Sequence, residues 1–237
     1  MIQKAYQPVL KDLISVFTRE FTTELDSLYI YGSVAKGKAV VDRSDLDICV
    51  VFKHQIEHLD QKIAEIKVKL ISIYPFIAKI DVDVGYLNEV LHEKNKSRWG
   101  AWIKFFCTNI YGRDLSCFFQ DIEIDRQVIR AINDGYHQEI QAYLYALKVK
   151  NKPQAELLSL KKSLIKRMIR LLPLTLNNIE DWPLSLNGTI EQTIQAYPQQ
   201  KNRLYFLLQE LYHPSLVDMF LLNQLTETYT WIEAHLI

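Results

Sequence analysis

Two aspartates and a glycine-serine turn are the residues of this sequence whose types and spacing could perform chemistry. Gly32 and Ser33 follow one apolar stretch, and Asp45 and Asp47 stand two residues apart at the start of another, residues 46–52. Glycine adopts backbone angles that other residues avoid, so the chain can approach a ligand closely at Gly32. Side chains alternate along a strand, so both carboxylates are expected on one face. The pattern indicates a site for phosphate groups and divalent cations.

The segment after the turn offers further phosphate donors. Residues 34–38 are expected to begin a short helix or loop, whose first backbone N–H groups have no partner within the segment. Such groups bind phosphate oxygens. Gly37 and Ser44 complete the pattern between the turn and the aspartates. The ordinary alternative is that Ser44 and Asp45 simply form a turn or a cap.

A second pair of acids lies in residues 76–87, where apolar and polar residues alternate. Such alternation is typical of a strand with one face in a core and the other in water. Asp81 and Asp83 fall on the wet face. An ordinary solvent-exposed face explains each aspartate taken alone. Together with Asp45 and Asp47, however, an acid from this strand could hold two Mg²⁺ ions about 3.5–4 Å apart.

The elements that must position these residues follow from hydrophobic periodicity. Helical spacing in the first half predicts helices over residues 8–25, 54–74 and 88–110. Apolar runs predict strands over residues 27–31 and 46–52, in addition to 76–87. A turn is expected at residues 111–114, with no strand after it.

The second half of the chain has helical periodicity throughout. Helices are expected over residues 128–150, 153–172, 189–197, 201–212 and 215–237. We therefore predict an α+β fold with two domains. Residues 1–118 would form a small mixed β-sheet with flanking helices, and residues 119–237 an all-α helical bundle.

Composition narrows the class of partner. The 237 residues carry 28 Lys and Arg against 28 Asp and Glu, so the formal net charge is zero. Duplex-binding proteins usually carry a basic excess, so long nucleic acid is not an expected partner. No apolar run approaches the roughly 18 residues that span a bilayer, and the N-terminus lacks the apolar core of a signal peptide. We expect a cytoplasmic protein without a membrane partner. The sequence is compatible with a homodimer.

The ordered set of glycines, serine and aspartates resembles the paired motif of the DNA polymerase β-like nucleotidyltransferase superfamily. The likeness is strongest to its minimal and aminoglycoside-type members and covers about the first 115 residues. The residues that carry it are Gly32-Ser33, Gly37 and Asp45-Leu46-Asp47-Ile48. The second half resembles, more loosely, the helical domain that follows this module in bacterial relatives.

The resemblance implies roles for the candidate residues. The glycine-serine turn would grip the triphosphate of ATP or another nucleoside triphosphate, and the paired aspartates would ligate two Mg²⁺ ions. The third acid would be Asp83, with Asp81 on the same face as the second choice. Asp45, Asp47 and Asp83 form the expected catalytic set.

The implied activity is Mg²⁺-dependent transfer of a nucleoside monophosphate to a hydroxyl of a small molecule, with release of pyrophosphate. AMP from ATP is the expected donor group, and an aminoglycoside-like compound is one acceptor class. A protein-modifying or antitoxin-type enzyme, acting on a tyrosine or serine of a partner protein, is the alternative. A non-catalytic nucleotide-binding module has little need for both Asp45 and Asp47.

A basic stripe in the second half has two interpretations. Lys162, Lys166 and Arg170 are spaced i, i+4, i+8, so they share one face of a predicted helix. A charge run of this kind is often only a solvated helix face. The alternative is that these side chains bind the triphosphate from the helical domain.

Overall fold

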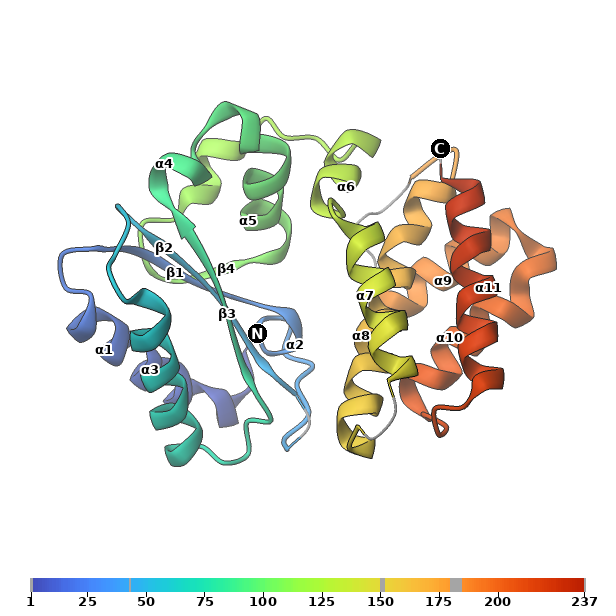
Figure 1. The fold of residues 1–237 in the computed structure, drawn as a ribbon. Helices are drawn as coiled ribbons and strands as arrows, with labels where there is room; N and C mark the ends of the chain where they lie inside the picture. The colour runs from blue at the N-terminus through green and yellow to red at the C-terminus, as the bar shows by residue number, and fades with distance from the viewer. Residues whose placement is uncertain (1, 43, 150–151, 180–184, 237) are drawn as a thin grey trace. The chain divides into compact units, whose positions relative to one another are not determined.

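The computed structural model describes residues 2–42, 44–149, 152–179 and 185–236. Residue contacts divide the chain into two compact units, Met1–Glu123 and Ile124–Ile237. The four strands labelled in Figure 1 belong to the first unit, and the labelled elements of the second are helices. The domain division predicted after residue 118 stays a prediction. No helix in the described ranges is long and apolar enough to cross a membrane.

The first unit is built on a mixed four-stranded sheet of order β3-β2-β1-β4. Its strands are β1 (Leu25–Tyr31), β2 (Leu46–Phe52), β3 (Ile80–Tyr86) and β4 (Thr108–Gly112). Strand β1 runs antiparallel to both β2 and β4, whereas β3 runs parallel to β2. The predicted α+β architecture with a small mixed sheet is confirmed.

Strand β4 corrects the prediction of a helix over residues 88–110 and a turn at 111–114. Thr108, Ile110 and Tyr111 are β-branched or aromatic residues that favour strands, and this segment pairs with β1. The expected long helix is instead a series of short pieces. They are α4 (Leu87–Val90), a 3-10 turn (Glu93–Asn95), a π-helical turn (Lys96–Gly100) and α5 (Ala101–Phe106).

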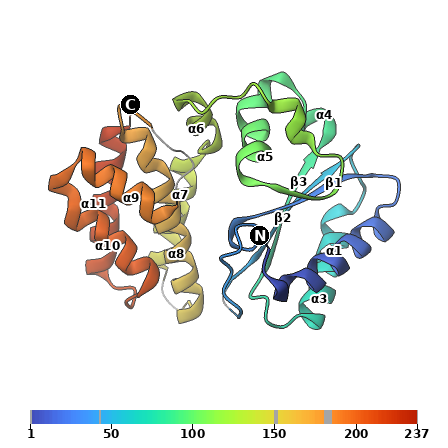
Figure 2. The same ribbon diagram turned by 180° about the vertical axis from the view of Figure 1, so that it is seen from behind.

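Helices α1 (Gln7–Glu20) and α3 (Leu59–Ile73) cover one face of the sheet. Alternation along the strands gives this face its apolar residues, which pack against the apolar stripes of both helices. Figure 2 shows α4 and α5 away from α1 and α3, beyond the strands. The buried core includes Leu13, Phe17, Leu28, Ile30, Ile48, Val50, Ile63, Ile66 and Leu70.

The second unit has its own apolar core among its helices. Its helices are α6 (Arg126–Ile132), α7 (Tyr136–Lys148), α8 (Gln154–Leu171), α9 (Leu186–Ala196), α10 (Lys201–Tyr212) and α11 (Met219–His235). The predicted continuous helix over 128–150 is wrong, because Gly135 takes a φ of +73° and separates α6 from α7. A buried ion pair joins α8 to α10, with 2.7 Å between Lys161 Nζ and Glu210 Oε2.

Candidate active site

The face of the sheet opposite α1 and α3 carries the acids that the sequence singles out. In the register of the sheet, Asp47 on β2 stands beside Tyr31 on β1 and beside Asp81 on β3. Asp83 stands beside Cys49, two residues farther along the same strands. Neighbouring residues in register project to the same side of a sheet. The structure therefore brings Asp47, Asp81 and Asp83 to one face, with Asp45 just before the start of β2.

The glycine turn lies directly against this acid face. Gly32 has a φ of +69°, which L-residues with a side chain rarely adopt. A Cβ built on Gly32 would lie 2.0 Å from Oδ2 of Asp47. Glycine is needed here both for the backbone angle and for the space. The turn after β1 thus lies in direct contact with Asp47, one of the candidate metal ligands.

Backbone hydrogen bonds between near neighbours hold residues 32–38 in a tight turn. Helix α2 (Gly32–Ala35) is one turn long, and the Lys38 amide donates to the carbonyl of Ser33 at 2.9 Å. Gly37 takes a φ of +65°, and its amide donates to the Val34 carbonyl at 3.1 Å. These bonds hold the predicted phosphate-binding residues in a compact loop beside β2.

The structure gives Ser44 a local partner. Its hydroxyl oxygen accepts a hydrogen bond from the Val40 amide at 2.8 Å, and its own amide donates to the Val40 carbonyl at 2.9 Å. These two bonds shape the loop that leads to Asp45. The nucleotide-binding role expected for Ser44 stays a prediction.

Tyr31 is a residue of this face that the sequence reasoning missed. Its hydroxyl donates to Oδ2 of Asp83 at 2.5 Å. Burial and the negative charge of Asp83 raise the pKa of Tyr31, so this hydroxyl keeps its proton. The ring packs edge-on against Trp102, with 4.9 Å between ring centroids. Strand alternation together with the pairing of β1 and β2 could have indicated Tyr31, since the two strands place it beside Asp47 on the same face.

Lys79 is the second residue that the sequence reasoning missed. Its Nζ lies 2.6 Å from Oδ1 of Asp81. The hydrogen bond with Asp81, together with the negative charges of Asp45 and Asp47, raises the pKa of Lys79 although burial opposes the shift. Strand alternation could have indicated this residue, because Lys79 precedes Asp81 by two positions and is therefore expected on the same face.

No group of three or more His, Cys, Asp or Glu side chains in the described part of the chain is arranged to hold a metal ion. The two candidates for the third acid are engaged within the protein, Asp81 with an ammonium group and Asp83 with a phenol hydroxyl. The donor chemistry nevertheless suits a hard cation, since the face presents carboxylate oxygens beside a bare glycine turn.

Comparison with known proteins identifies the first unit. Residues 10–107 match the family described as nucleotidyltransferase domain, a span that includes the glycine turn and all four candidate acids. These residues form a nucleotidyltransferase domain. The resemblance to the DNA polymerase β-like superfamily is thereby confirmed, and so is the prediction that the chain is a nucleotidyltransferase enzyme.

A solved structure shares the fold of the whole chain. It is the crystal structure of spectinomycin adenyltransferase AAD(9) from Enterococcus faecialis with ATP and spectinomycin. The match covers 97% of this chain and 98% of that chain, with a TM-score of 0.64 and 16% sequence identity. The likeness therefore extends past the nucleotidyltransferase domain into the helical unit. No curated protein sequence matches the chain.

The basic stripe lies in the helical unit, outside the matched nucleotidyltransferase domain. Lys162, Lys166 and Arg170 are exposed along one side of α8. Lys161 differs from them, because it is buried and donates to Glu210 and to the carbonyl of Ser215. The stripe thus consists of exposed cations, whereas the adjacent Lys161 is buried in the core of the helical unit.

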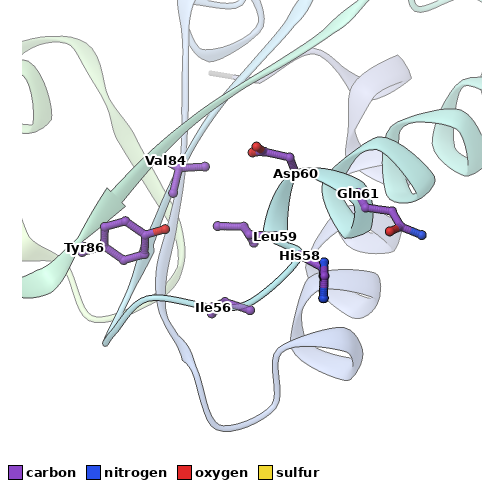
Figure 3. Close-up of a pocket in the computed structure, with 7 residues that line it drawn as sticks. All are labelled: Ile56, His58, Leu59, Asp60, Gln61, Val84 and Tyr86. Carbon is purple, nitrogen blue, oxygen red and sulfur yellow. The ribbon is translucent and has the colours of Figure 1, made fainter.

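A cavity of about 540 Å³ lies on the other side of the nucleotidyltransferase sheet from the acids. Figure 3 shows Val84 and Tyr86 of β3 near the start of α3. These two residues alternate with Asp83 and Gly85 along the strand, so the cavity is separate from the acid face. Its lining is Ile56, His58, Leu59, Asp60, Gln61, Val84 and Tyr86.

Proposed function

We propose that this enzyme transfers AMP from ATP to a hydroxyl of a small molecule and releases pyrophosphate. The observation that carries the proposal is the packing of the Gly32 turn against Asp47, on the face that also holds Asp81 and Asp83. The likeness to a fold crystallised with ATP and spectinomycin supports both the donor and the class of acceptor.

The residues of the acid face fit two Mg²⁺ ions. Asp45 and Asp47 would hold them together with Asp83, and Asp81 is the second choice for the third ligand. Carboxylate oxygens are the donors that Mg²⁺ prefers, and Mg²⁺ favours sites that it shares with substrate phosphates. When bound, such ions neutralise phosphate charge and polarise the attacking hydroxyl.

The chain's own residues would position the reactants. Backbone N–H groups of the Gly32-Ser33 turn would hold the outer phosphates, so that the α-phosphorus faces the acceptor. The acceptor oxygen then forms a bond to the α-phosphorus while the bond from that phosphorus to the β-phosphate oxygen breaks. The acceptor proton would pass to a carboxylate, for which we propose Asp83, held in orientation by Tyr31. Positioning and charge neutralisation would supply most of the rate enhancement.

The role of the basic stripe on α8 stays a proposal. Positive side chains stabilise phosphate groups through charge-assisted hydrogen bonds. Lys162, Lys166 and Arg170 are exposed, which is compatible with contact to a triphosphate and equally with a solvated helix face.

The test is a transfer assay with ATP labelled at the α-phosphate, Mg²⁺ and a panel of hydroxylated aminocyclitols and aminoglycosides that includes spectinomycin. We expect label in a small molecule and an equal amount of pyrophosphate. Asp47→Asn should lower the rate by roughly 100-fold or more, because it removes charge stabilisation at the reacting phosphate. Asp60→Asn, on the other side of the sheet, is the matched control and should keep the rate of the parent enzyme.

Two results would count against the proposal. Absence of Mg²⁺–ATP binding in calorimetry would remove the donor substrate. Label on a single protein of a cell lysate, with none on small molecules, would favour the protein-modifying alternative instead.

A further inference from the structure

Lys79 is held at the acid face by its backbone as well as by its side chain. Its carbonyl accepts a hydrogen bond from the Leu46 amide at 2.8 Å, which places it beside the start of β2. Asp45 is the residue directly before that start. The Lys79 ammonium in turn lies 2.6 Å from Oδ1 of Asp81. The Lys79 side chain is therefore paired with an acid of β3, while its backbone is bonded to the first residue of β2.

The negative charge of the acid face explains why a cation at Lys79 would matter. Four aspartates lie on β2 and β3 or directly before them, and like charges so close together repel one another. The Lys79 ammonium offsets part of this charge, because it lies within ion-pair distance of Asp81. An edge strand such as β3 often carries a lysine only to prevent pairing with another chain. The Lys79 ammonium also pairs with Asp81, a contact that this edge role does not require.

We propose that Lys79 is an internal counter-ion of the acid face, paired with Asp81, and that it competes with divalent cations for the carboxylates. The inference rests on the proposed function, because it takes these carboxylates to be the metal ligands. Lys79 would thus set the concentration of divalent metal at which the site fills.

The exposure of the pair suits a counter-ion that can be displaced. The Lys79 side chain is 62% exposed and that of Asp81 is 37% exposed. Exposed ion pairs contribute little to stability, so the ammonium can swing into water when a divalent ion arrives. Since a nearby positive charge repels the incoming ion, its removal should strengthen metal binding.

The experiment compares the full-length parent protein with Lys79→Met, Lys79→Arg and Lys69→Met. Lys79→Met keeps the length of the side chain without its charge, and Lys79→Arg keeps the charge. Lys69→Met removes an exposed lysine from α3, which covers the other face of the sheet. Binding of Mn²⁺ without nucleotide is followed by electron paramagnetic resonance. The rise of melting temperature with MgCl₂, at ionic strength matched with KCl, is the second readout.

We expect Lys79→Met to bind Mn²⁺ roughly three- to tenfold more tightly than the parent. Lys79→Arg and Lys69→Met should bind like the parent. Without metal, Lys79→Met should melt close to the parent, because an exposed ion pair contributes little to stability, and it should gain more from Mg²⁺. In an Asp81→Asn background the effect of Lys79→Met should shrink, because one of the repelling charges and the partner of the ammonium are gone.

The failures of the two proposals are distinguishable. If the parent binds Mn²⁺ and Lys79→Met binds it with equal or lower affinity, the counter-ion role is wrong and the metal site stands. The counter-ion role is also wrong if Lys69→Met tightens binding as much as Lys79→Met. If neither the parent nor Lys79→Met binds Mn²⁺ or is stabilised by Mg²⁺, the metal site and the counter-ion role fail together.

Discussion

At the scale of single residues, the contact between Gly32 and Asp47 is the most constrained feature of the acid face. The backbone of Gly32 occupies the volume next to a carboxylate oxygen, and its positive φ disfavours any residue with a Cβ. The chain can therefore place the turn that we propose to bind phosphate and a carboxylate at nearly the same point. Any atom added there displaces one or the other.

This contact predicts the outcome of Gly32→Ala. The new Cβ would lie 2.0 Å from Asp47 Oδ2, so the carboxylate or the turn must move. We expect nucleotidyl transfer to fall by roughly 100-fold, which is typical of misplacing a reacting group by about 1 Å. Pyrophosphate release measures the loss of activity, and urea unfolding measures the loss of stability.

Gly135→Ala is the matched control for this prediction. Gly135 has a φ of +73°, but nothing lies within 4 Å of a Cβ built there. Both variants should lose about 1–2 kcal/mol of unfolding free energy through backbone strain. Only Gly32→Ala should lose activity. Equal activity losses in the two variants would show that the clash of the new Cβ with Asp47 is not the cause of the loss in Gly32→Ala.

At the scale of secondary-structure elements, Tyr29 connects β1 to the segment that follows β4. The side chain is 1% exposed, and its hydroxyl donates to the Arg113 carbonyl at 3.1 Å. The same oxygen accepts from the Leu115 amide at 2.7 Å. This pair of bonds fastens the end of the edge strand to the centre of the sheet.

The burial of Tyr29 predicts a pH dependence of stability. Burial raises the pKa of Tyr29 from its ordinary value of 10.0 to about 12. Between these values the folded protein keeps the phenol proton that the unfolded chain has lost. This contribution to stability is therefore complete below pH 10 and declines as pH rises towards 12, by about 1.4 kcal/mol at pH 11.

Tyr29→Phe provides the comparison for the pH dependence. The variant should be less stable near neutral pH by about 1–3 kcal/mol, because the buried Leu115 amide loses its acceptor. From pH 9 to 11 its unfolding free energy in urea should decline less than that of the parent. Parallel declines would mean that the Tyr29 phenol does not titrate differently in the folded and unfolded states.

At the scale of the whole molecule, each unit has a core of its own. Leu13 of α1 is fully buried in the first core, and Leu207 of α10 is fully buried in the second. Truncating either side chain to alanine should cost roughly 2–5 kcal/mol, through lost burial and the cavity that remains. The two changes should act on different parts of the chain.

Hydrogen exchange followed by mass spectrometry tests this division. Leu13→Ala should increase exchange in β1, β2 and α3 more than in the second unit. Leu207→Ala should do the reverse, with its largest increases in α8, α10 and α11. If either variant increased exchange equally in the strands and in α8, the chain would unfold as one cooperative unit and the prediction would be wrong.

Features that depend on neighbouring residues could be predicted from the amino-acid sequence. The glycine at position 32 predicts a tight turn. Strand alternation predicts that Asp45 shares a face with Asp47, and that Asp81 shares a face with Asp83. Strand β2 has the predicted bounds, 46–52, because a continuous apolar run is unmistakable between polar neighbours. Helical periodicity likewise identified the second half as helical, although it did not register the break at Gly135.

Contacts between distant groups could be found only in the folded chain. Strand β4 is short and its sequence is ambiguous, so its pairing with β1 determined its conformation. The contacts of Tyr31 with Asp83 and of Lys161 with Glu210 join residues 52 and 49 positions apart. Lys79 is close to Asp81 in sequence, but its place beside Asp45 depends on the parallel pairing of β2 and β3. Periodicity reports which face a side chain takes, whereas its partner depends on the register between strands and the packing between helices, which no local pattern contains.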